Sequence, residues 1–492
     1  MMLKNRASLL YVLLIILGPS VWGNNIQITN GGLADQNTTG NFTMVKFDIS
    51  WENSWRNPRN HDAAWVFVKF SANGGPWQHA TINYVDGTAV NDGHVEPSGA
   101  TIRTPSDKFG VFIYRDSSGG GNVNWSNVKL RWNYGADGVS DLDLIEIRIF
   151  GVEMVYVPEG EFAVGSGGTS TNEFTLTTIV TGNSTISPTG TGTLGGAGGG
   201  YPTGQTPSPN TSWPNGYKAF YCMKYELSEA QWVEFFNVLT PTEKTTRDIT
   251  ANHPTYGGKN TDAASSRNTV SWTSGNATSS APDRACSFLS YADGAAYADW
   301  SGLRPITELE YEKACRGGIA PVADEFVWGT TNVHTTAYTI SAGTNGQPNE
   351  FIDNPGIGTG NISFNPTDGA IDGPLRCGIF AASAVNPTAE ETGGTYYGIM
   401  EMSGNLMERC VTIGNVDGGT FLPIHGNGEL DVNGETDITQ WPAPATASGM
   451  GGRGGAWNLP FGSIRLSSRA DATTTDAIRR PNFGWRAVRT AE

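Results

Sequence analysis

The chain closes with Gly454-Gly455-Ala456-Trp457 and, after Arg465 and Arg469, with Asn482-Phe483-Gly484-Trp485-Arg486. These residues end a series of sequence signatures that begins near Met154. The closing segment contains no cysteine. The order of the signatures therefore indicates a fold, while the missing thiols limit the chemistry that can be assigned to it.

Helix starts mark the earlier signatures. Ser228-Glu229-Ala230-Gln231 is a capping box, in which the first and last side chains satisfy each other's backbone N–H groups. Trp232, Phe235, Phe236 and Leu239 follow it at helical spacing. The pattern predicts a helix that begins after Ser228.

Two further helices are predicted. Tyr291–Trp300 is rich in alanine. Thr307 and Glu310 form another capping box, and Gly317-Gly318 is a stop signal. Short apolar strands are predicted at 154–162 and 220–227.

These segments resemble the formylglycine-generating enzyme family, also called sulfatase-modifying factors, over roughly Met154 to Arg489. The best-matched runs are 304–312 (Arg-Pro-Ile-Thr-Glu-Leu-Glu-Tyr-Glu), 404–408 (Gly-Asn-Leu-Met-Glu) and 484–486 (Gly-Trp-Arg). Each run alone is weak evidence, but their order and spacing are specific. The resemblance implies an α+β, C-type-lectin-like domain with long loops at 152–492.

The region before this domain, 24–151, reads as an antiparallel β-sandwich. Val45, Phe47, Ile49 and Trp51 alternate with polar residues, which is the period of a half-buried strand. Similar apolar patterns separated by Gly, Asn and Asp recur at 66–70, 111–113, 128–132 and 145–149. The whole chain is therefore expected to be α+β, with a β-sandwich first.

The first 23 residues read as a secretory signal peptide. Lys4 and Arg6 precede an apolar stretch, Leu9–Leu17, that is too short to span a bilayer. We expect a mature chain that starts near Asn24 and is secreted or at the cell surface, in the periplasm or outside the cell. An uncleaved anchor is the alternative. No later segment is long and apolar enough to be transmembrane.

The chain is acidic, with 47 Asp and Glu against 31 Lys and Arg. This balance argues against nucleic acid and anionic membrane as partners. It suits an extracellular protein that binds cations, although an acidic surface also simply keeps a protein soluble. The expected partner is an extracellular glycan or protein.

Five cysteines are present, all in the second domain: Cys222, Cys286, Cys315, Cys377 and Cys410. An odd number cannot all pair, although secretion permits disulfides. Cys286 with Cys315 is one plausible pair, because both flank the same helical segment. No Cys-x-x-Cys motif suggests a zinc or redox site.

Three insertions interrupt the second domain. Ser166–Gly216 is a low-complexity stretch of Gly, Ser, Thr and Pro that lacks the apolar content to fold alone. Thr240–Asp283 and Thr330–Tyr396 are rich in loops. Long loops on a compact scaffold are frequent binding elements.

The resemblance also implies which chemistry is missing. Aerobic enzymes of the family hold copper through two cysteines after the Gly-Gly-Ser motif, but Leu459 stands at the first of these positions and no cysteine occupies the second. Copper(I) prefers soft thiolates, so we expect neither copper nor formylglycine formation. A non-haem iron site is also not indicated, because none of the six histidines lies three or four residues from another.

Calcium is the cofactor that the resemblance implies, in a structural role. The family's calcium loop matches 401–408, where Glu401, Glu408 and backbone oxygens near Met402, Gly404 and Leu406 are hard oxygen ligands. The alternative for Glu408 is a buried carboxylate paired with an arginine. A second family site maps loosely onto Asn361, Asp368 and Asp372.

The leading hypothesis is a non-catalytic binding or structural protein. The last segment also resembles the variable region of proteins diversified by retroelements, which share this scaffold. On that model Arg465, Arg469 and Trp485 are framework. The ligand surface would then comprise Asn458, Leu459, Pro460, Gly462, Ser463, Leu466 and Ser468, and Phe461 in the same stretch is a further ligand-binding candidate. The alternative is an ordinary divergent family member with the same scaffold spacing.

The first domain offers a second candidate surface. Exposed tryptophan rings bind sugars by stacking, and Trp55 and Trp77 lie in stretches that read as polar loops. Burial in the core is the alternative for each ring.

Another class of function is also open: an enzyme of the same family, such as a metal-dependent oxidase, with a non-standard active site. Metal analysis would separate these hypotheses, since calcium alone favours binding and copper or iron favours oxidation.

Overall fold

The computed structural model describes residues 26–182, 212–472 and 474–492. They form two compact units, Ile26–Trp55 with Ala64–Val152, and Arg56–Ala63 with Glu153–Glu492. The predicted signal peptide lies outside the described residues. None of the described helices is long and apolar enough to cross a membrane.

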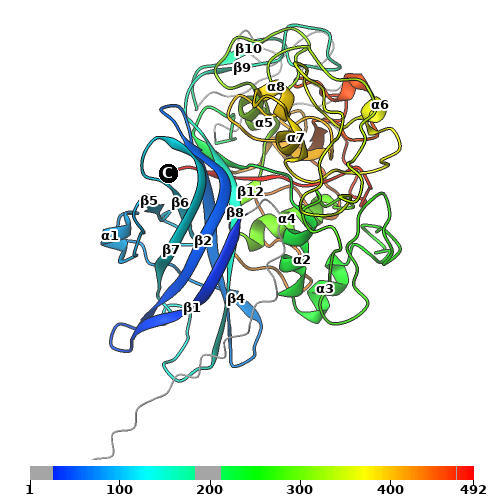
Figure 1. Ribbon diagram of the computed structural model, residues 1–492. Helices are drawn as coiled ribbons and strands as arrows, with labels where there is room; N and C mark the ends of the chain where they lie inside the picture. The colour runs from blue at the N-terminus through cyan, green and yellow to red at the C-terminus, as the bar shows by residue number, and fades with distance from the viewer. Residues whose placement is uncertain (1–25, 183–211, 473) are drawn as a thin grey trace, which may run out of the picture. The chain divides into compact units, whose positions relative to one another are not determined.

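The first unit is an antiparallel β-sandwich, as predicted. One sheet has the strand order β1-β2-β7, and these strands run side by side in Figure 1. The facing strands are β3, β4, β5 and β6, together with the first part of β8. The elements are β1 (Gln27–Asn37), β2 (Phe42–Arg56), β3 (Asp62–Ala72), β4 (Trp77–His79), α1 (Ala89–Asp92), β5 (Ala100–Arg103), β6 (Val111–Arg115), β7 (Gly119–Trp132) and β8 (Ile145–Val157).

Alternating side chains fill the core of this sandwich. The four residues of β2 that were predicted to face inward are at most 1% exposed: Val45, Phe47, Ile49 and Trp51. Trp51 packs edge-on against Trp125, with ring centroids 5.3 Å apart. The inner faces of the other strands add Val66, Val68, Phe70, Val111, Ile113, Val128, Leu130 and Trp132. Burial of these apolar side chains stabilises the unit.

The second unit combines short strands, short helices and long loops. Its main strands have the order β12-β15-β11-β8, with antiparallel pairs, and two hairpin-like pairs are β9 with β10 and β13 with β14. The strands are β9 (Phe162–Val164), β10 (Thr177–Ile179), β11 (Phe220–Met223), β12 (Arg304–Pro305), β13 (Glu408–Val411), β14 (Met450–Arg453) and β15 (Ala487–Thr490). The helices are α2 (Glu229–Asn237), α3 (Pro241–Arg247), α4 (Tyr291–Trp300), α5 (Glu308–Arg316), α6 (Asn365–Asp368), α7 (Ile379–Ser383), α8 (Ala389–Thr392), α9 (Val416–Gly419) and the 3-10 helix η1 (Phe461–Ser463).

The predicted helix starts are confirmed. Ser228 and Gln231 form both bonds of a capping box at α2, and Thr307 and Glu310 do the same at α5. Gly317 ends α5 with a φ of 64°, a conformation that glycine adopts without a steric cost. These local signals fix where the helices begin and end.

The low-complexity insertion is partly ordered, which the sequence did not indicate. Thr177–Ile179 pairs with Phe162–Val164, and Trp213 is 2% exposed. Phe174 is also buried, so scattered aromatic residues are enough to fix the ends of the insertion. Residues 183–211 lie outside the described part of the chain.

The five cysteines are free and buried, so the expected Cys286–Cys315 pair is wrong. The Cys286 thiol lies 3.9 Å from Asn268 Nδ2, whereas the Cys315 thiol lies near Cys222. Flanking one helix in sequence therefore does not bring the two thiols together. The second unit is held by packing and by buried ion pairs instead.

Candidate functional site

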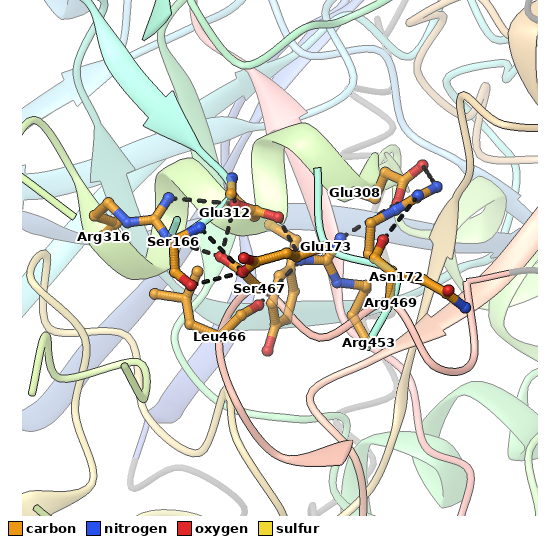
Figure 2. Close-up of polar contacts among 12 residues, drawn as sticks. Ser166, Asn172, Glu173, Glu308, Glu312, Arg316, Arg453, Leu466, Ser467 and Arg469 are labelled. Atoms are coloured by element: carbon orange, nitrogen blue, oxygen red, sulfur yellow. Dashed lines mark hydrogen bonds and ion pairs between the residues drawn. The ribbon is translucent and has the colours of Figure 1, made fainter. Parts of the chain in front are cut away.

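A buried ionic network holds the closing segment of the chain against α5, as Figure 2 shows. Arg469 Nε donates to Glu308 Oε2 at 2.7 Å, and Arg453 Nη2 donates to Glu312 Oε1 at 2.7 Å. Arg316 Nη2 donates to the Ser467 hydroxyl at 2.8 Å. The three arginines and two glutamates are at most 2% exposed. We call this set, Glu308, Glu312, Arg316, Arg453 and Arg469, the ionic frame.

Glu308 of the frame is held ionised. Burial would raise the pKa of Glu308, but Arg469 and Arg453 hold that pKa below its usual value. Glu308 also accepts from the Thr412 hydroxyl and the Ile413 N–H, both at 2.9 Å. Buried charges with this many partners fix a geometry rather than provide a reactive group.

The low-complexity insertion contributes to the same network, and sequence analysis missed this. The Arg469 N–H donates to Thr171 O at 2.8 Å, and its guanidinium lies 4.1 Å from the Phe174 ring centroid. The Ser166 hydroxyl donates to Glu173 Oε2 at 2.6 Å, and both residues are drawn among the members of the network in Figure 2. Phe174 is the residue that could have signalled an ordered contact here.

Between the frame residues Arg453 and Arg469 lies an exposed turn, Trp457–Ser463. Its first half is tied to the rest of the domain, because Trp457 N donates to Asn405 O at 2.8 Å and Asn365 N donates to Leu459 O at 3.0 Å, and its second half is closed by the Ser463 N bond to Pro460 O at 3.0 Å. Asn458 is exposed, and Leu459 and Ser463 are half-buried. We call this segment the display turn.

Phe461 is the aromatic centre of the display turn. It is 37% exposed, and its ring packs edge-on against Phe326 at 5.4 Å. Arg465 lies over the ring at 5.3 Å and pairs with Asp324 at 2.7 Å. The turn therefore offers a supported aromatic ring beside a guanidinium.

Two of the residues expected at the ligand surface do not lie there. Leu466 is 0% and Ser468 is 3% exposed, so the prediction for both is wrong. The chain folds back into the ionic frame after Arg465, and residues 466–469 are all buried. Arg469 and Trp485 are buried, in agreement with a framework role.

The candidate sugar-binding tryptophans of the first unit lie on strands rather than in polar loops. Trp55 is in β2 and Trp77 is in β4, and both are half-buried. The guanidinium of Arg148 lies 4.9 Å from the centroid of the Trp77 ring. One face of that ring is therefore already covered.

The candidate calcium loop brings three buried carboxylates together. Arg486 Nη2 donates to Glu408 Oε1 at 3.1 Å, while Glu408 Oε2 and Glu401 Oε1 have no hydrogen-bond partner among the residues that the structure describes. Burial raises the pKa of Glu401 to about 7, and burial and neighbouring Glu408 raise that of Glu226. One guanidinium thus faces Glu226, Glu401 and Glu408.

The backbone packs closely around these carboxylates. A Cβ on Gly454 would lie 2.7 Å from both Glu408 Oε2 and Met402 O, so only glycine lets the chain pass beside these two oxygens. The Gly404 and Leu406 N–H groups are bound by Gly454 O and Glu226 Oε1. Oxygen atoms without partners fit a hard cation. However, no group of three His, Cys, Asp or Glu side chains in the described residues is arranged to hold a metal.

The second candidate calcium site has its oxygens in use. Asn361 Oδ1 accepts from the Tyr338 hydroxyl at 3.0 Å, and Asp368 Oδ2 accepts from Asp372 N at 2.9 Å. Asp372 is exposed. Of the two loops, 401–408 fits calcium better.

Calcium binding at 401–408 is expected to raise the melting temperature of the second unit, because a cation would offset the repulsion between Glu401 and Glu408. Chelation should lower that temperature, and Glu408→Gln, which keeps an acceptor for Arg486, should abolish the response. Calorimetry with and without chelator measures it. Exposed Glu159→Ala is the control. Identical melting with and without chelator would exclude the site.

The thiols are unsuited to redox or nucleophilic chemistry. All five are at most 4% exposed, and burial raises the pKa of each, to about 12 for Cys222. Reactive thiols need an exposed, electropositive setting. None of them lies in the display turn, which contains no cysteine.

The fold and the ionic frame define a compact α+β domain with long loops around a short sheet. The chain belongs to the family described as the sulfatase-modifying factor enzyme 1-like domain, which it matches over residues 150–491. No curated protein matches the chain. Among solved structures it resembles Treponema denticola variable protein 1, with 12% identity, a TM-score of 0.33, and coverage of 70% of this chain and 96% of that one.

Proposed function

We propose that the protein is a secreted, non-catalytic binding protein that uses the display turn to hold an extracellular glycan or protein. The observation that carries the proposal is an exposed, tethered turn with Leu459 where catalytic relatives would have a thiolate. A rigid support lowers the entropy that a loop loses on binding. The sequence of residues 1–23 supports secretion.

The composition of the turn favours recognition. Phe461 offers a partly exposed aromatic ring that packs edge-on against Phe326, with the Arg465 guanidinium over the ring. Aromatic and arginine side chains dominate the energetics of many interfaces. Asn458 adds an exposed amide with two donors and an acceptor. This combination suits a flat, partly polar ligand surface.

Changing Asn458, Phe461 and Ser463 to alanine together is expected to remove most binding, because it deletes the ring and two polar contacts. The intact chain should first be screened on glycan and protein arrays, and the variant then compared on every ligand found. Loss of at least about tenfold in affinity is expected from the anchor ring alone. Val432→Ala, at an 80% exposed apolar position, is the control. A folded variant that keeps every interaction would make the turn a scaffold element only.

Family membership supports a second candidate, an enzyme with an unrecognised active site. The protein is expected not to convert a Cys-x-Pro-x-Arg sulfatase peptide to formylglycine with copper and oxygen, because no thiolate pair is available to hold copper(I). Mass spectrometry of the peptide checks this. A mass loss that matches the aldehyde would replace the binding proposal with an enzymatic one.

A further inference from the structure

The insertions 240–283 and 330–396 both line a cavity that is not part of the display turn or of the candidate calcium loops. It has a volume of about 310 Å³ and is lined by Arg267 from one insertion and by residues 338–340, Asn345 and residues 370–371 from the other. This is within the range of small-molecule sites. We call it the Arg267 cavity.

One side of the Arg267 cavity is apolar. Ile340, Ala370 and Ile371 line it, and Tyr338 adds ring surface. The Tyr338 hydroxyl is engaged elsewhere, since it donates to Asn361 Oδ1 and accepts from Ile362 N at 3.1 Å. The isoleucines pack on a cluster of buried apolar residues, so this wall is fixed.

The other side is polar and positively charged. Arg267 and Arg284 both donate to Asn345 Oδ1, at 2.9 and 3.0 Å. Both also contact Glu350 Oε2, at 2.9 and 3.4 Å. Two guanidiniums therefore share one carboxylate, and Glu350 is buried behind them at 1% exposure. The other nearby acid, Asp368, is bound to the Asp372 N–H.

The polar side chains that line this end, Arg267, Thr339 and Asn345, offer hydrogen-bond donors. Among the described residues, Arg267 Nε has no partner although its side chain is only 9% exposed. Glu350 Oε1 also has no partner in the part of the chain that the structure describes, but Glu350 is not part of the lining. The Asn345 oxygen is occupied by the arginines, which leaves its amide nitrogen, and the Thr339 hydroxyl is nearby in the lining. Donors without partners select an acceptor, and a guanidinium matches a carboxylate best.

The backbone at Arg267 is constrained to hold this arrangement. Ser266 and Arg267 have φ angles of 42° and 61°, which non-glycine residues rarely adopt. A Cβ on Gly373 would lie 2.4 Å from Ser266 O, so the two insertions are in close contact. Arg267 Nη1 also donates to Pro374 O at 2.8 Å. Backbone strain of this kind is common at ligand-binding sites.

We propose that the Arg267 cavity binds a small organic carboxylate with an apolar body, with the carboxylate at Arg267 and Asn345 and the body against Ile340 and Ile371. The site goes beyond the binding role proposed for the display turn. An aliphatic acid and a sugar acid share the carboxylate but differ in the body, which is apolar in the first and polar in the second, so the experiment includes both and the apolar wall should favour the aliphatic acid.

The test is calorimetric titration of the full chain with isovalerate and with glucuronate, each beside its neutral counterpart, isovaleramide and glucose. We expect at least one acid to bind about tenfold or more tightly than its counterpart, since the guanidinium needs an anion. Tighter isovalerate identifies an aliphatic acid as the ligand type, and tighter glucuronate a sugar acid. Equal binding within both pairs, or no dissociation constant below about 1 mM, would overturn the proposal.

Variants locate the binding. Ala370→Trp, at an exposed lining position, should block the cavity without touching the arginine network. Arg267→Lys keeps the charge but loses the planar fork, and should weaken binding about tenfold. The Asn458/Phe461/Ser463 variant should bind the acid normally, which separates this site from the display turn. Unchanged binding by Ala370→Trp would contradict the assignment.

Discussion

Replacing Glu308 with alanine is expected to lower the free energy of unfolding of the second unit by about 3–5 kcal/mol, the range for breaking a buried ion pair. The change leaves Arg453 and Arg469 without their shared carboxylate in a place where neither reaches water. Hydrogen exchange of the α5 amides in urea measures this unit separately from the first.

The matched control is Arg480→Ala. This arginine pairs with Asp476 at 2.8 Å, but its side chain is 51% exposed, and exposed pairs contribute little. A Glu308→Ala protein as stable as the Arg480→Ala protein would mean that the ionic frame does not hold the closing segment.

Gly294→Ala is the second change with a large expected effect. In an ordinary helix, alanine would stabilise this position by about 1 kcal/mol relative to glycine. Here a Cβ would lie 2.0 Å from Trp485 Cε3, and that ring is 0% exposed. The steric clash with Trp485 should therefore outweigh the helix-propensity gain, with a net loss of about 2 kcal/mol or more in the free energy of unfolding.

Thermal unfolding and near-ultraviolet circular dichroism, which reports the Trp485 environment, would measure this loss. Gly462→Ala is the control, because nothing lies within 4 Å of its Cβ position. A gain in stability for Gly294→Ala would show that α4 and Trp485 are less tightly packed than the structure indicates.

Local signals in the sequence predicted much of the fold. The alternation in β2 and the capping boxes of α2 and α5 depend on neighbours a few residues apart, and each is found where expected. The family motifs placed Arg469 and Trp485 in the framework, and both are buried. These features needed no knowledge of distant contacts.

The errors concern contacts between distant parts of the chain. Leu466 reads as a surface position in the sequence. In the structure it is buried, because Arg453 donates both to Glu312 and to the Leu466 carbonyl oxygen. Trp77 reads as a loop residue because its strand has only three residues. The Arg267 cavity could not be predicted at all, since its walls come from two irregular insertions with no periodic pattern.

The path of the chain through Arg56–Ala63 has a practical consequence for dissection. Within the second unit, Asn60 Nδ2 donates to Tyr397 O at 2.8 Å, and Asp62 lies 3.7 Å from the Lys224 ammonium. A gene fragment that starts at residue 153 would encode the family domain without these residues and would leave Lys224 with one acid fewer. The second unit is thus discontinuous in sequence, although the family match is the continuous stretch 150–491, and no single cut yields both units whole.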